Sequence, residues 1–401
     1  MRTDSKKPSH GSSRPLCLAV DGRSLCGTRT GVGTYTANLL EGLLHLDDAL
    51  EILVFTNGDL PDFPWEDAGR VKVIKRPRHS RNNLLWSHFS LRPALAGRGI
   101  GLFHSPSYTL PLRLPIPAVV TIHDVVYAAH PEWYPHHSGM LRRMWYRASA
   151  LSARHVLTVS EFSRREILRV YPLVPDKVSV VYPGVDRQRF RNVQDPGLVE
   201  SLRNRYGLRG DFLLFVGDIH RRRNIGRIIQ AFGSIKDSSP AFRDLELVLI
   251  GRVLEPETGS TESLHTDSEG AIRRLGYVSD DDLPLFYSLA KAFVFPSLYE
   301  GFGFGVAEAM ACGCPVIVGR STACDEVAGE AGICVDPTDV KSIAEAARSL
   351  LSDRNMSANH AAAGLRRSAE FSWDKTAEAT LSIYRVLADT RRAICLPPFP
   401  R

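Results

Sequence analysis

The chain of 401 residues is 44% hydrophobic and 23% charged, values that predict a globular protein of two or three domains of about 100 to 200 residues each. Its formal charge of +6 fits an anionic ligand or a membrane surface, and the excess is too small to call for nucleic acid as a partner. The polar first residues lack the apolar run of a secretion signal, and no stretch reaches the roughly 18 apolar residues that span a bilayer, so we expect a cytoplasmic protein.

The first half of the chain alternates between predicted strands and helices, after a polar stretch at residues 1–15 that predicts a disordered tail. Short runs rich in Val, Ile, Leu and Phe occur at residues 16–20, 52–55, 71–74, 118–122, 155–159 and 178–182. Their apolar residues are continuous rather than alternating, which indicates strands covered on both faces. Helix-period stretches at 35–46 and 163–171 separate them, so residues 16–190 predict an α/β domain with a parallel sheet.

The same pattern restarts in the second half of the chain. Apolar runs occur at residues 212–217, 245–251, 292–297, 315–319 and 332–336, with helix-period stretches at 224–235 and 342–353. The turn-rich YPGVD at 182–186 ends the first series, so we place a second α/β domain at residues 191–372. Residues 373–392 predict a closing helix that packs back towards the first domain.

Two doubly wound, Rossmann-like domains predict an interdomain cleft at the carboxyl ends of the strands, where ligands of open α/β sheets bind. In the first domain, TGVGTYTANLL at 30–40 places Gly31 and Gly33 just before a helix, where the backbone can approach an anion at the positive helix end. A plain strand-to-helix turn is the alternative. Thr36 stands where the dinucleotide fingerprint needs a third glycine, which disfavours a nicotinamide dehydrogenase.

Two polar residues, His123 and Asp124, come directly after the apolar strand of the first domain that ends in VVTI. This position predicts that they enter the cleft rather than the core. A solitary histidine is often structural, and that alternative stays open for His123. Asp124 has two possible tasks at this point, which are to orient the imidazole or to cap a turn.

Three consecutive arginines follow the first strand of the second domain, in VGDIHRRRNIGRI at 216–228. A run of charges is usually a solvated face. Here the run occupies a strand-to-helix junction, where a guanidinium can donate two parallel hydrogen bonds to a phosphate. We therefore predict anion binding by Arg222 and Arg223.

The stretch EGFGFGVAEAM at 300–310 sets two carboxylates, Glu300 and Glu308, around glycines 301, 303 and 305. It follows a predicted strand and begins a helix near Gly305, whose first N–H groups lack internal acceptors and suit a diphosphate. Glu300 is then placed to reach the sugar of such a ligand, and Glu308 to accept hydrogen bonds from ribose hydroxyls. The alternatives are a solvated loop acid for Glu300 and a favourable charge near a helix N-terminus for Glu308.

No metal site is predicted. The seven cysteines form no paired ladder, which fits a reducing compartment, and Cys312 and Cys314 lack the second close pair that a zinc site needs.

A membrane contact is suggested by SGMLRRMWYRASALSARH at 138–155, where a helix would put Met140, Met144, Trp145 and Ala148 on one face and three arginines elsewhere. An amphipathic basic helix of this kind can lie on an anionic bilayer. The alternative is an ordinary helix that packs its apolar face into the first domain.

The chain resembles the retaining nucleotide-sugar glycosyltransferases of family four, also called glycosyl transferases group 1, over roughly residues 16 to 390. The resemblance rests on TGVGTYTANLL, TIHD, LTVSEFSRREI, VVYPGVD, FVGDIHRRRN, LGYVSDDDL and, most specifically, PSLYEGFGFGVAEAMACGCPVIVGRSTACDEVAGEAGICVDP. It implies the two-domain GT-B fold and the absence of an essential metal.

The resemblance also implies roles for individual residues. It places Glu300 on the transferred sugar, Glu308 on the ribose, and Arg222 and Arg223 on the diphosphate. Two departures from the family pattern matter, because Arg223 replaces the usual lysine and Gly305 replaces a frequent proline. The predicted catalytic residues are His123, Glu300, Arg222 and Arg223, and the predicted donor-binding residues are Gly33, Val278, Phe302, Gly303, Phe304, Gly305 and Glu308.

The expected reaction is transfer of a hexosyl group from a nucleoside diphosphate sugar to the hydroxyl of a glycan or lipid-linked acceptor, with the anomeric configuration retained. TGVGTYTANLL and TIHD most resemble the bacterial mannosyltransferases that build surface polysaccharides from GDP-mannose. A UDP- or dTDP-sugar donor is one alternative, and a degenerate, non-catalytic sugar-nucleotide binder is another. The acceptor, the linkage and the oligomeric state do not follow from the sequence.

Overall fold

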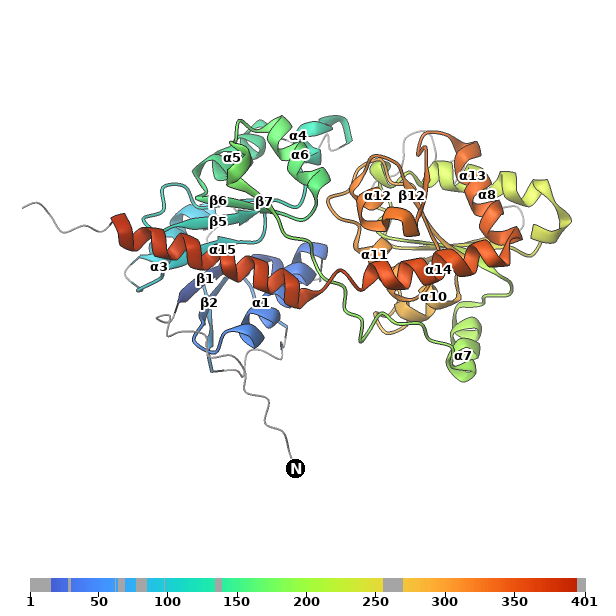
Figure 1. Ribbon diagram of the computed structural model, residues 1–401, viewed down its shortest axis with the longest axis horizontal. Coiled ribbons are helices and arrows are strands. Elements are labelled where there is room, and N and C mark those ends of the chain that lie inside the picture. The colour runs from blue at the N-terminus through green and yellow to red at the C-terminus, as the bar shows by residue number, and fades with distance from the viewer. Residues whose placement is uncertain are drawn as a thin grey trace, which may run out of the picture. The chain divides into compact units, whose positions relative to one another are not determined.

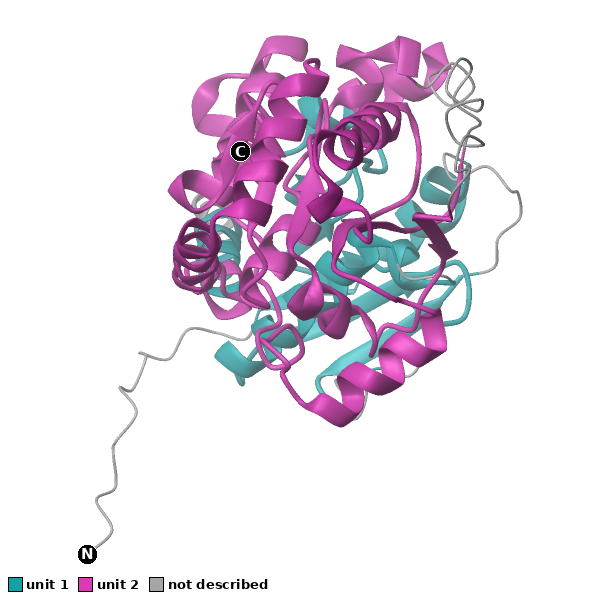
Figure 2. Ribbon diagram, turned by 90° about the vertical axis from the view of Figure 1, so that its right-hand side faces the viewer, with its two compact units in different colours: residues 1–121, 148–156, 377–401 teal, residues 122–147, 157–376 magenta. Residues whose placement is uncertain are grey.

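The computed structural model describes residues 16–27, 30–61, 63, 69–76, 85–96, 98–133, 139–254 and 270–394. The predicted tail at 1–15 lies outside these residues. By contacts the chain divides into unit 1, which is Met1–Thr121, Ala148–Val156 and Ala377–Arg401, and unit 2, which is Ile122–Arg147 and Leu157–Thr376 (Figure 2). Within the described ranges, no helix has both the length and the apolar composition needed to cross a membrane.

The first sheet has seven strands in the order β3-β2-β1-β4-β5-β6-β7. The strands are β1 (Cys17–Asp21), β2 (Glu51–Thr56), β3 (Val71–Lys75), β4 (Leu102–Ser105), β5 (Ala118–Thr121), β6 (His155–Thr158) and β7 (Val178–Val180). The pairs from β3 to β5 are all parallel. All four residues of β4 and of β5 are buried, as expected for strands that are covered on both faces.

The helices that accompany this half of the chain are α1 (Gly31–Leu46), α3 (Arg92–Leu95), α4 (Val126–Ala129), α5 (Met140–Ser152) and α6 (Glu161–Val170). The helix α1 begins at Thr30, whose side chain accepts a hydrogen bond from the Gly33 N–H. Ser160 caps α6 in the same way, by accepting from the Ser163 N–H.

The second sheet has six strands in the order β10-β9-β8-β11-β12-β13. The strands are β8 (Phe212–Val216), β9 (Glu246–Ile250), β10 (Ile272–Gly276), β11 (Ala292–Phe295), β12 (Val316–Gly319) and β13 (Ile333–Val335). All neighbours pair in parallel. The strand order reverses between β8 and β11, which makes the carboxyl ends of these two strands the ligand-binding position of a doubly wound sheet.

The remaining helices are α7 (Pro196–Tyr206), α8 (Ile225–Ser238), α10 (Leu283–Leu289), α11 (Phe304–Ala311), α12 (Ala323–Ala328), α13 (Val340–Ser352), α14 (Arg354–Ser368) and α15 (Trp373–Ile394). Around the second sheet, α8 packs beside α13, and α11 beside α14 (Figure 1). The predicted α/β fold with two doubly wound parallel sheets is confirmed.

The closing helix α15 runs from Trp373 to Ile394. From Ala377 onward its contacts assign it to unit 1. There Tyr384 makes a hydrogen bond of 2.5 Å to His104 Nδ1, and Arg385 Nη2 lies 3.0 Å from Asp47 Oδ2.

Candidate functional site

The connection from β8 to α8 carries the three arginines at the carboxyl end of β8. Gly217 has φ of 145°, a backbone conformation that favours glycine, and Arg221–Arg223 form a 3₁₀ turn. The turn ends at Asn224, which has a left-handed φ of 64°. Its side-chain amide donates to the carbonyl oxygens of Pro296 at 2.9 Å and Pro337 at 2.6 Å, so the arginine turn is fixed to the segments that follow β11 and β13.

Glu300 lies in the loop between β11 and α11 and contacts this turn. Its Oε1 accepts a hydrogen bond from Ser297 Oγ at 3.0 Å and lies 3.0 Å from Arg223 Nη1 and 3.9 Å from Arg222 Nε. The residue is only 5% exposed. Glu300 is therefore a buried, paired carboxylate and not a solvated loop acid.

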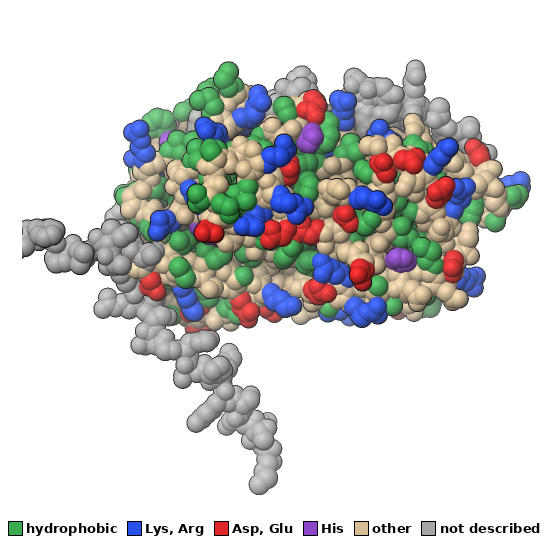
Figure 3. Space-filling model, turned by 45° about the horizontal axis from the view of Figure 1, so that its top comes forward, with side chains coloured by type: hydrophobic (Ala, Val, Ile, Leu, Met, Phe, Trp, Pro, Cys, Tyr) green, Lys and Arg blue, Asp and Glu red, His purple; other side chains and the backbone are tan. Residues whose placement is uncertain are grey.

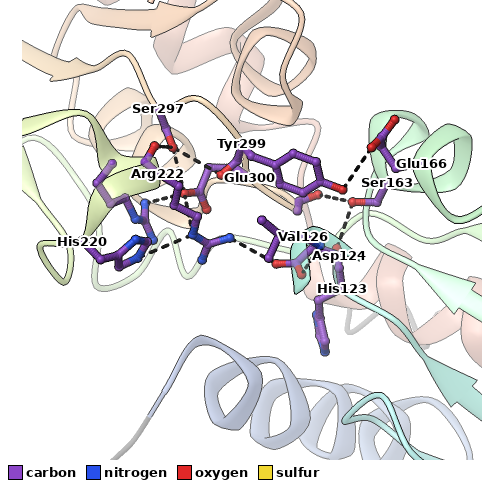
Figure 4. A network of polar contacts seen from close by, with 12 residues as sticks. His123, Asp124, Val126, Ser163, Glu166, His220, Arg222, Ser297, Tyr299 and Glu300 are labelled. Carbon is purple, nitrogen blue, oxygen red and sulfur yellow. Dashed lines mark hydrogen bonds and ion pairs between the residues drawn. The ribbon is translucent and has the colours of Figure 1, made fainter. Parts of the chain in front are cut away.

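Asp124 joins the same cluster from the loop after β5. Its Oδ2 lies 3.3 Å from Arg222 Nη1, and its Oδ1 accepts from the Val126 N–H at 3.3 Å. Of the two tasks considered for Asp124, the structure shows the cap of the turn, and it adds the ion pair with Arg222. Figure 4 shows Asp124, Arg222 and Glu300 pointing toward one another, whereas the His123 side chain points away from them.

Two serines at the start of α6 hold the loops that carry His123 and Glu300. Ser163 Oγ lies within hydrogen-bond distance of the carbonyl oxygens of His123, at 2.9 Å, and Gly301, at 3.0 Å. Ser160 Oγ contacts the Gly301 oxygen at 2.6 Å, and both serines are fully buried. The sequence contained these residues in LTVSEFSRREI, but their spacing alone did not indicate what they hold.

Gly301 is fixed by close packing as well. A Cβ at this position would lie 2.3 Å from the His123 carbonyl oxygen, so only glycine permits this approach of the two loops.

His220, just before the arginine turn, stays neutral. Burial first, and then the charges of Arg222 and Arg223, lower its pKa to about 2. The neutral ring can accept from Arg222, whose Nε lies 3.5 Å from His220 Nε2. Sequence analysis did not single out this histidine, because its effect depends on burial.

The start of α11 has the form that the glycine-rich stretch predicts. Gly303 precedes the helix with φ of 95°, and a Cβ there would lie 2.7 Å from Cys324 Sγ. The first N–H groups of a helix have no acceptor within the helix, so they are suited to an anion. The helix begins at Phe304, one residue before the predicted start.

Glu308 lies about one turn into α11 and contacts Tyr287, whose hydroxyl donates to Glu308 Oε2 at 3.1 Å. The residue is partly exposed, yet its carboxylate is surrounded by protein, and this burial raises its pKa to about 7. The two glutamates therefore have different partners, since Glu300 pairs with Arg223 and Glu308 accepts from Tyr287.

Three other predicted donor-binding residues, Gly33, Val278 and Phe302, are buried. Val278 and Phe302 are 5% and 3% exposed, and the Phe302 ring packs edge to face against Phe371. In unit 1 the Gly33 N–H donates to Thr30 Oγ1 at 3.3 Å, and a Cβ on Gly33 would lie 2.5 Å from the Ser24 oxygen. The side chains of Val278 and Phe302 are thus core residues, so donor contacts there would have to come from the backbone. The roles assigned to all these residues stay predictions.

In the part of the chain that the structure describes, no group of three or more His, Cys, Asp or Glu side chains is arranged to hold a metal ion. Burial raises the pKa of the Cys312 thiol to about 12, which makes it a poor ligand at neutral pH.

Two family patterns match most of the chain. The family described as Glycosyltransferase Family 4 matches residues 29–189, and the family described as Glycosyl transferases group 1 matches residues 201–367. The O-antigen chain mannosyltransferase B of Escherichia coli is 30% identical over 383 residues, which are 89% of this chain and 96% of that protein.

Solved structures share the fold at low sequence identity. The sucrose-phosphate synthase of Thermosynechococcus elongatus has a TM-score of 0.73 at 20% identity, with coverage of 94% of this chain and 100% of that one. Anabaena Alr3699/HepE in complex with UDP and glucose has a TM-score of 0.69 at 17% identity, with coverage of 92% and 100%.

Proposed function

Because the chain belongs to the glycosyltransferases of family four, with the GT-B fold, and is a hexosyltransferase, we propose that it transfers mannose from GDP-mannose to a hydroxyl of a glycan or lipid-linked oligosaccharide, with retention of the anomeric configuration. The name of the E. coli relative supports mannose and a role in surface polysaccharide synthesis. The complex of the Anabaena structural neighbour with UDP and glucose supports a nucleoside diphosphate sugar as donor.

The observation that carries the proposal is the pairing of Arg222 and Arg223 with Glu300 at the strand-order reversal of the second sheet. Cleavage of the bond to the sugar develops negative charge on the leaving diphosphate and positive character on the sugar. Two guanidinium groups on side chains that are only 14% and 17% exposed match the first charge, and a buried carboxylate matches the second. Charges that are in place once the donor has bound stabilise the developing charges without further reorganisation, and this preorganisation is the usual source of electrostatic catalysis.

The first N–H groups of α11 add to the binding of the diphosphate. His123 is proposed to hold hydroxyl groups of the transferred sugar and the acceptor. A leaving phosphate oxygen takes the proton of the acceptor hydroxyl on the same face of the sugar, which accounts for retention. This chemistry requires no metal, so the proposal includes none.

The donor is tested with a panel of GDP-, UDP- and dTDP-sugars, with binding measured by thermal shift and turnover by nucleotide release. We expect GDP-mannose to give the largest shift in melting temperature and the fastest release. A larger response to a UDP- or dTDP-sugar would replace the proposed donor. Binding of a donor without turnover on any acceptor would support the degenerate binder instead, a possibility that Arg223 in place of lysine keeps relevant.

We propose in addition that α5 makes a peripheral contact with the cytoplasmic face of the cell membrane. Of the predicted stripe, Met140 and Met144 are 71% and 59% exposed and their neighbour Leu141 is 77% exposed, whereas Trp145 and Ala148 are half-buried. The N-terminal part of the stripe therefore does not pack into the protein. The helix contains three arginines and no acidic residue, which gives it the charge that an anionic bilayer attracts. Figure 3 shows hydrophobic side chains interspersed with Lys and Arg side chains on the face that it draws.

Liposome flotation tests the membrane contact. We expect the parent protein to float with vesicles that contain anionic lipid and not with neutral vesicles, and we expect Arg142→Glu with Arg143→Glu to abolish flotation. The double variant Arg354→Glu with Arg366→Glu makes the same change of charge on exposed residues of α14 and serves as the control. Equal flotation on neutral vesicles, or equal loss in both double variants, would contradict the proposal.

A further inference from the structure

An aromatic pair lies on the loop that follows His123 and Asp124. The rings of His130 and Trp133 are stacked, with centroids 4.1 Å apart and planes inclined by 11°. Between them in sequence, Glu132 Oε1 lies 3.0 Å from His130 Nδ1. The His130 and Glu132 side chains are 35% and 55% exposed, and Trp133 is partly exposed, so the pair is accessible and not a core cluster.

This pair rests on the residue that precedes Glu300. The Tyr299 ring meets His130 edge to face at 5.6 Å and Trp133 at 6.5 Å, and Phe162 packs against Tyr299 at 5.1 Å. Tyr299 is only 2% exposed, so it is a fixed base for the pair. The packing links His130 and Trp133 directly to the loop that positions Glu300, and all of these residues belong to unit 2.

The turn that carries His130 and Trp133 also interacts electrostatically with the arginine turn, Arg221–Arg223. The Glu132 backbone N–H and the His130 side chain lower the pKa of Glu132, and the charge of Arg221 adds to this effect. Glu132 is thus an ionised carboxylate beside a flat aromatic surface, near the residues proposed to bind the diphosphate.

We infer that His130 and Trp133 form a subsite for a hexose ring of the acceptor, with Glu132 accepting hydrogen bonds from its hydroxyls. The face of an aromatic ring carries negative charge density, which attracts the polarised C–H groups on one face of a hexose. A carboxylate accepts well from sugar hydroxyls, whereas it repels a phosphate. A neutral glycan therefore suits this surface better than the nucleoside diphosphate does. The inference rests on the proposed function, since it names where the acceptor of that reaction binds.

The experiment compares Trp133→Ala and Trp133→Phe with Phe242→Ala in the full-length chain. Phe242 is the matched control, because it is also a partly exposed aromatic residue at the third position of a 3₁₀ turn, Pro240–Phe242, before β9. Isothermal titration with α-mannotriose reports on the subsite, and titration with GDP reports on the donor site. Melting temperatures are measured for every variant.

We expect Trp133→Ala to weaken mannotriose binding at least tenfold, Trp133→Phe to retain most of it, and Phe242→Ala to leave it unchanged. GDP affinity should change less than twofold in all three variants. Glu132→Gln, on an exposed side chain, should weaken mannotriose binding severalfold and provides a test if Trp133→Ala fails to fold.

Three outcomes would overturn the inference. The first is unchanged mannotriose binding in both Trp133→Ala and Glu132→Gln. The second is an equal loss of GDP and mannotriose binding in the folded variants. The third is no binding of mannotriose by a parent protein that binds GDP. Failure of the proposed function is a separate result, because it is measured in the donor panel as a larger response to another nucleotide sugar or as the absence of turnover, and not by mannotriose titration of the variants.

Discussion

The two sheets reverse strand order in the same way, and an arginine–carboxylate cluster lies at each reversal. In the first sheet, Asp21 at the end of β1 is fully buried, and Arg23 contacts it at 2.9 Å through Nε and 2.5 Å through Nη2. Ser105 at the end of β4 adds a hydrogen bond of 3.3 Å to Asp21. In the second sheet, Arg222 and Arg223 contact Asp124 and Glu300, which come from other segments of the chain.

The two clusters differ in how far apart in sequence the arginine and its carboxylate partner lie. Arg23 pairs with a carboxylate two residues away, so its charge is neutralised within one turn. Its other contacts are uncharged, namely a hydrogen bond of 3.0 Å to Thr109 Oγ1 and the Trp86 ring at 5.2 Å. Arg222 and its partner Asp124 are 98 residues apart in sequence. We infer that partners on separate loops can be exchanged for a diphosphate, whereas a local pair cannot. The same topology thus yields a structural ion pair in one sheet and a candidate ligand site in the other.

The largest expected effect is on the local pair. Arg23→Ala leaves the Asp21 carboxylate buried without its cation, which should lower the free energy of unfolding by about 3 to 5 kcal/mol. Chemical denaturation measures this change. If the comparison of the two clusters is right, the variant that is still folded binds GDP as tightly as the parent protein, and a loss of affinity would assign the first cluster to the ligand site.

The second effect is on turnover. Arg223→Ala should lower kcat by about 100- to 1,000-fold, since it removes a donor from the developing charge of the diphosphate. Arg223→Lys restores the residue usual in the family and should recover most of the activity. Arg221→Ala, on an exposed arginine of the same turn, is the control and should change kcat only slightly. Equal losses in Arg221→Ala and Arg223→Ala would show that net charge, and not the paired geometry, matters.

The third effect separates the two glutamates. Glu300→Gln should lower kcat about ten- to hundredfold with a smaller rise in the donor KM, because the proposed role of the carboxylate is to favour the charge that builds on the sugar in the transition state. Glu308→Ala should mainly raise the donor KM, because its contacts are present before and during bond cleavage. Steady-state kinetics measures kcat and the donor KM of both variants, and melting temperatures show whether both are folded. The same changes in kcat and KM in both variants would contradict the division of roles.

The smallest effect is a pH dependence that originates in Glu308. Its folded-state pKa of about 7 lies above the ordinary value of 4.5, so the carboxyl group ionises less readily in the folded protein than in the unfolded chain. The contribution of Glu308 to the free energy of unfolding therefore falls as pH rises from about 4.5 to 7. The stability gained by Glu308→Gln over the parent protein should therefore grow across this range and level off above it. Denaturation at pH 5, 6, 7 and 8 measures it.

Nucleotide affinity should follow the opposite direction. In its predicted role the ionised Glu308 carboxylate accepts hydrogen bonds from ribose hydroxyls. We therefore expect GDP affinity to rise severalfold between pH 6 and 8 in the parent protein and to stay flat in Glu308→Gln. A parallel rise in both proteins would assign the pH dependence to another group.

The sequence alone determined the local features of this protein. Continuous apolar runs identified both parallel sheets, because a strand covered on both faces needs apolar residues on both sides of its pleat. The same reasoning placed the arginine turn and the glycine-rich stretch at the carboxyl ends of strands. Gly303 and Gly301 could also be anticipated as a group, because such bare backbone serves close approach or left-handed conformations.

Only the tertiary structure decided which of these ends meet. The adjacency of β8 and β11 brings Arg223 to Glu300, and the bonds from Ser160 and Ser163 to Gly301 join residues that are 141 and 138 positions apart. Such pairings depend on strand order and on the packing of distant loops, which a local pattern does not encode. The exposure of Met140 and Leu141, and the burial that raises the pKa of Glu308, have the same origin, because exposure and electrostatic environment belong to the folded surface and not to the order of residues.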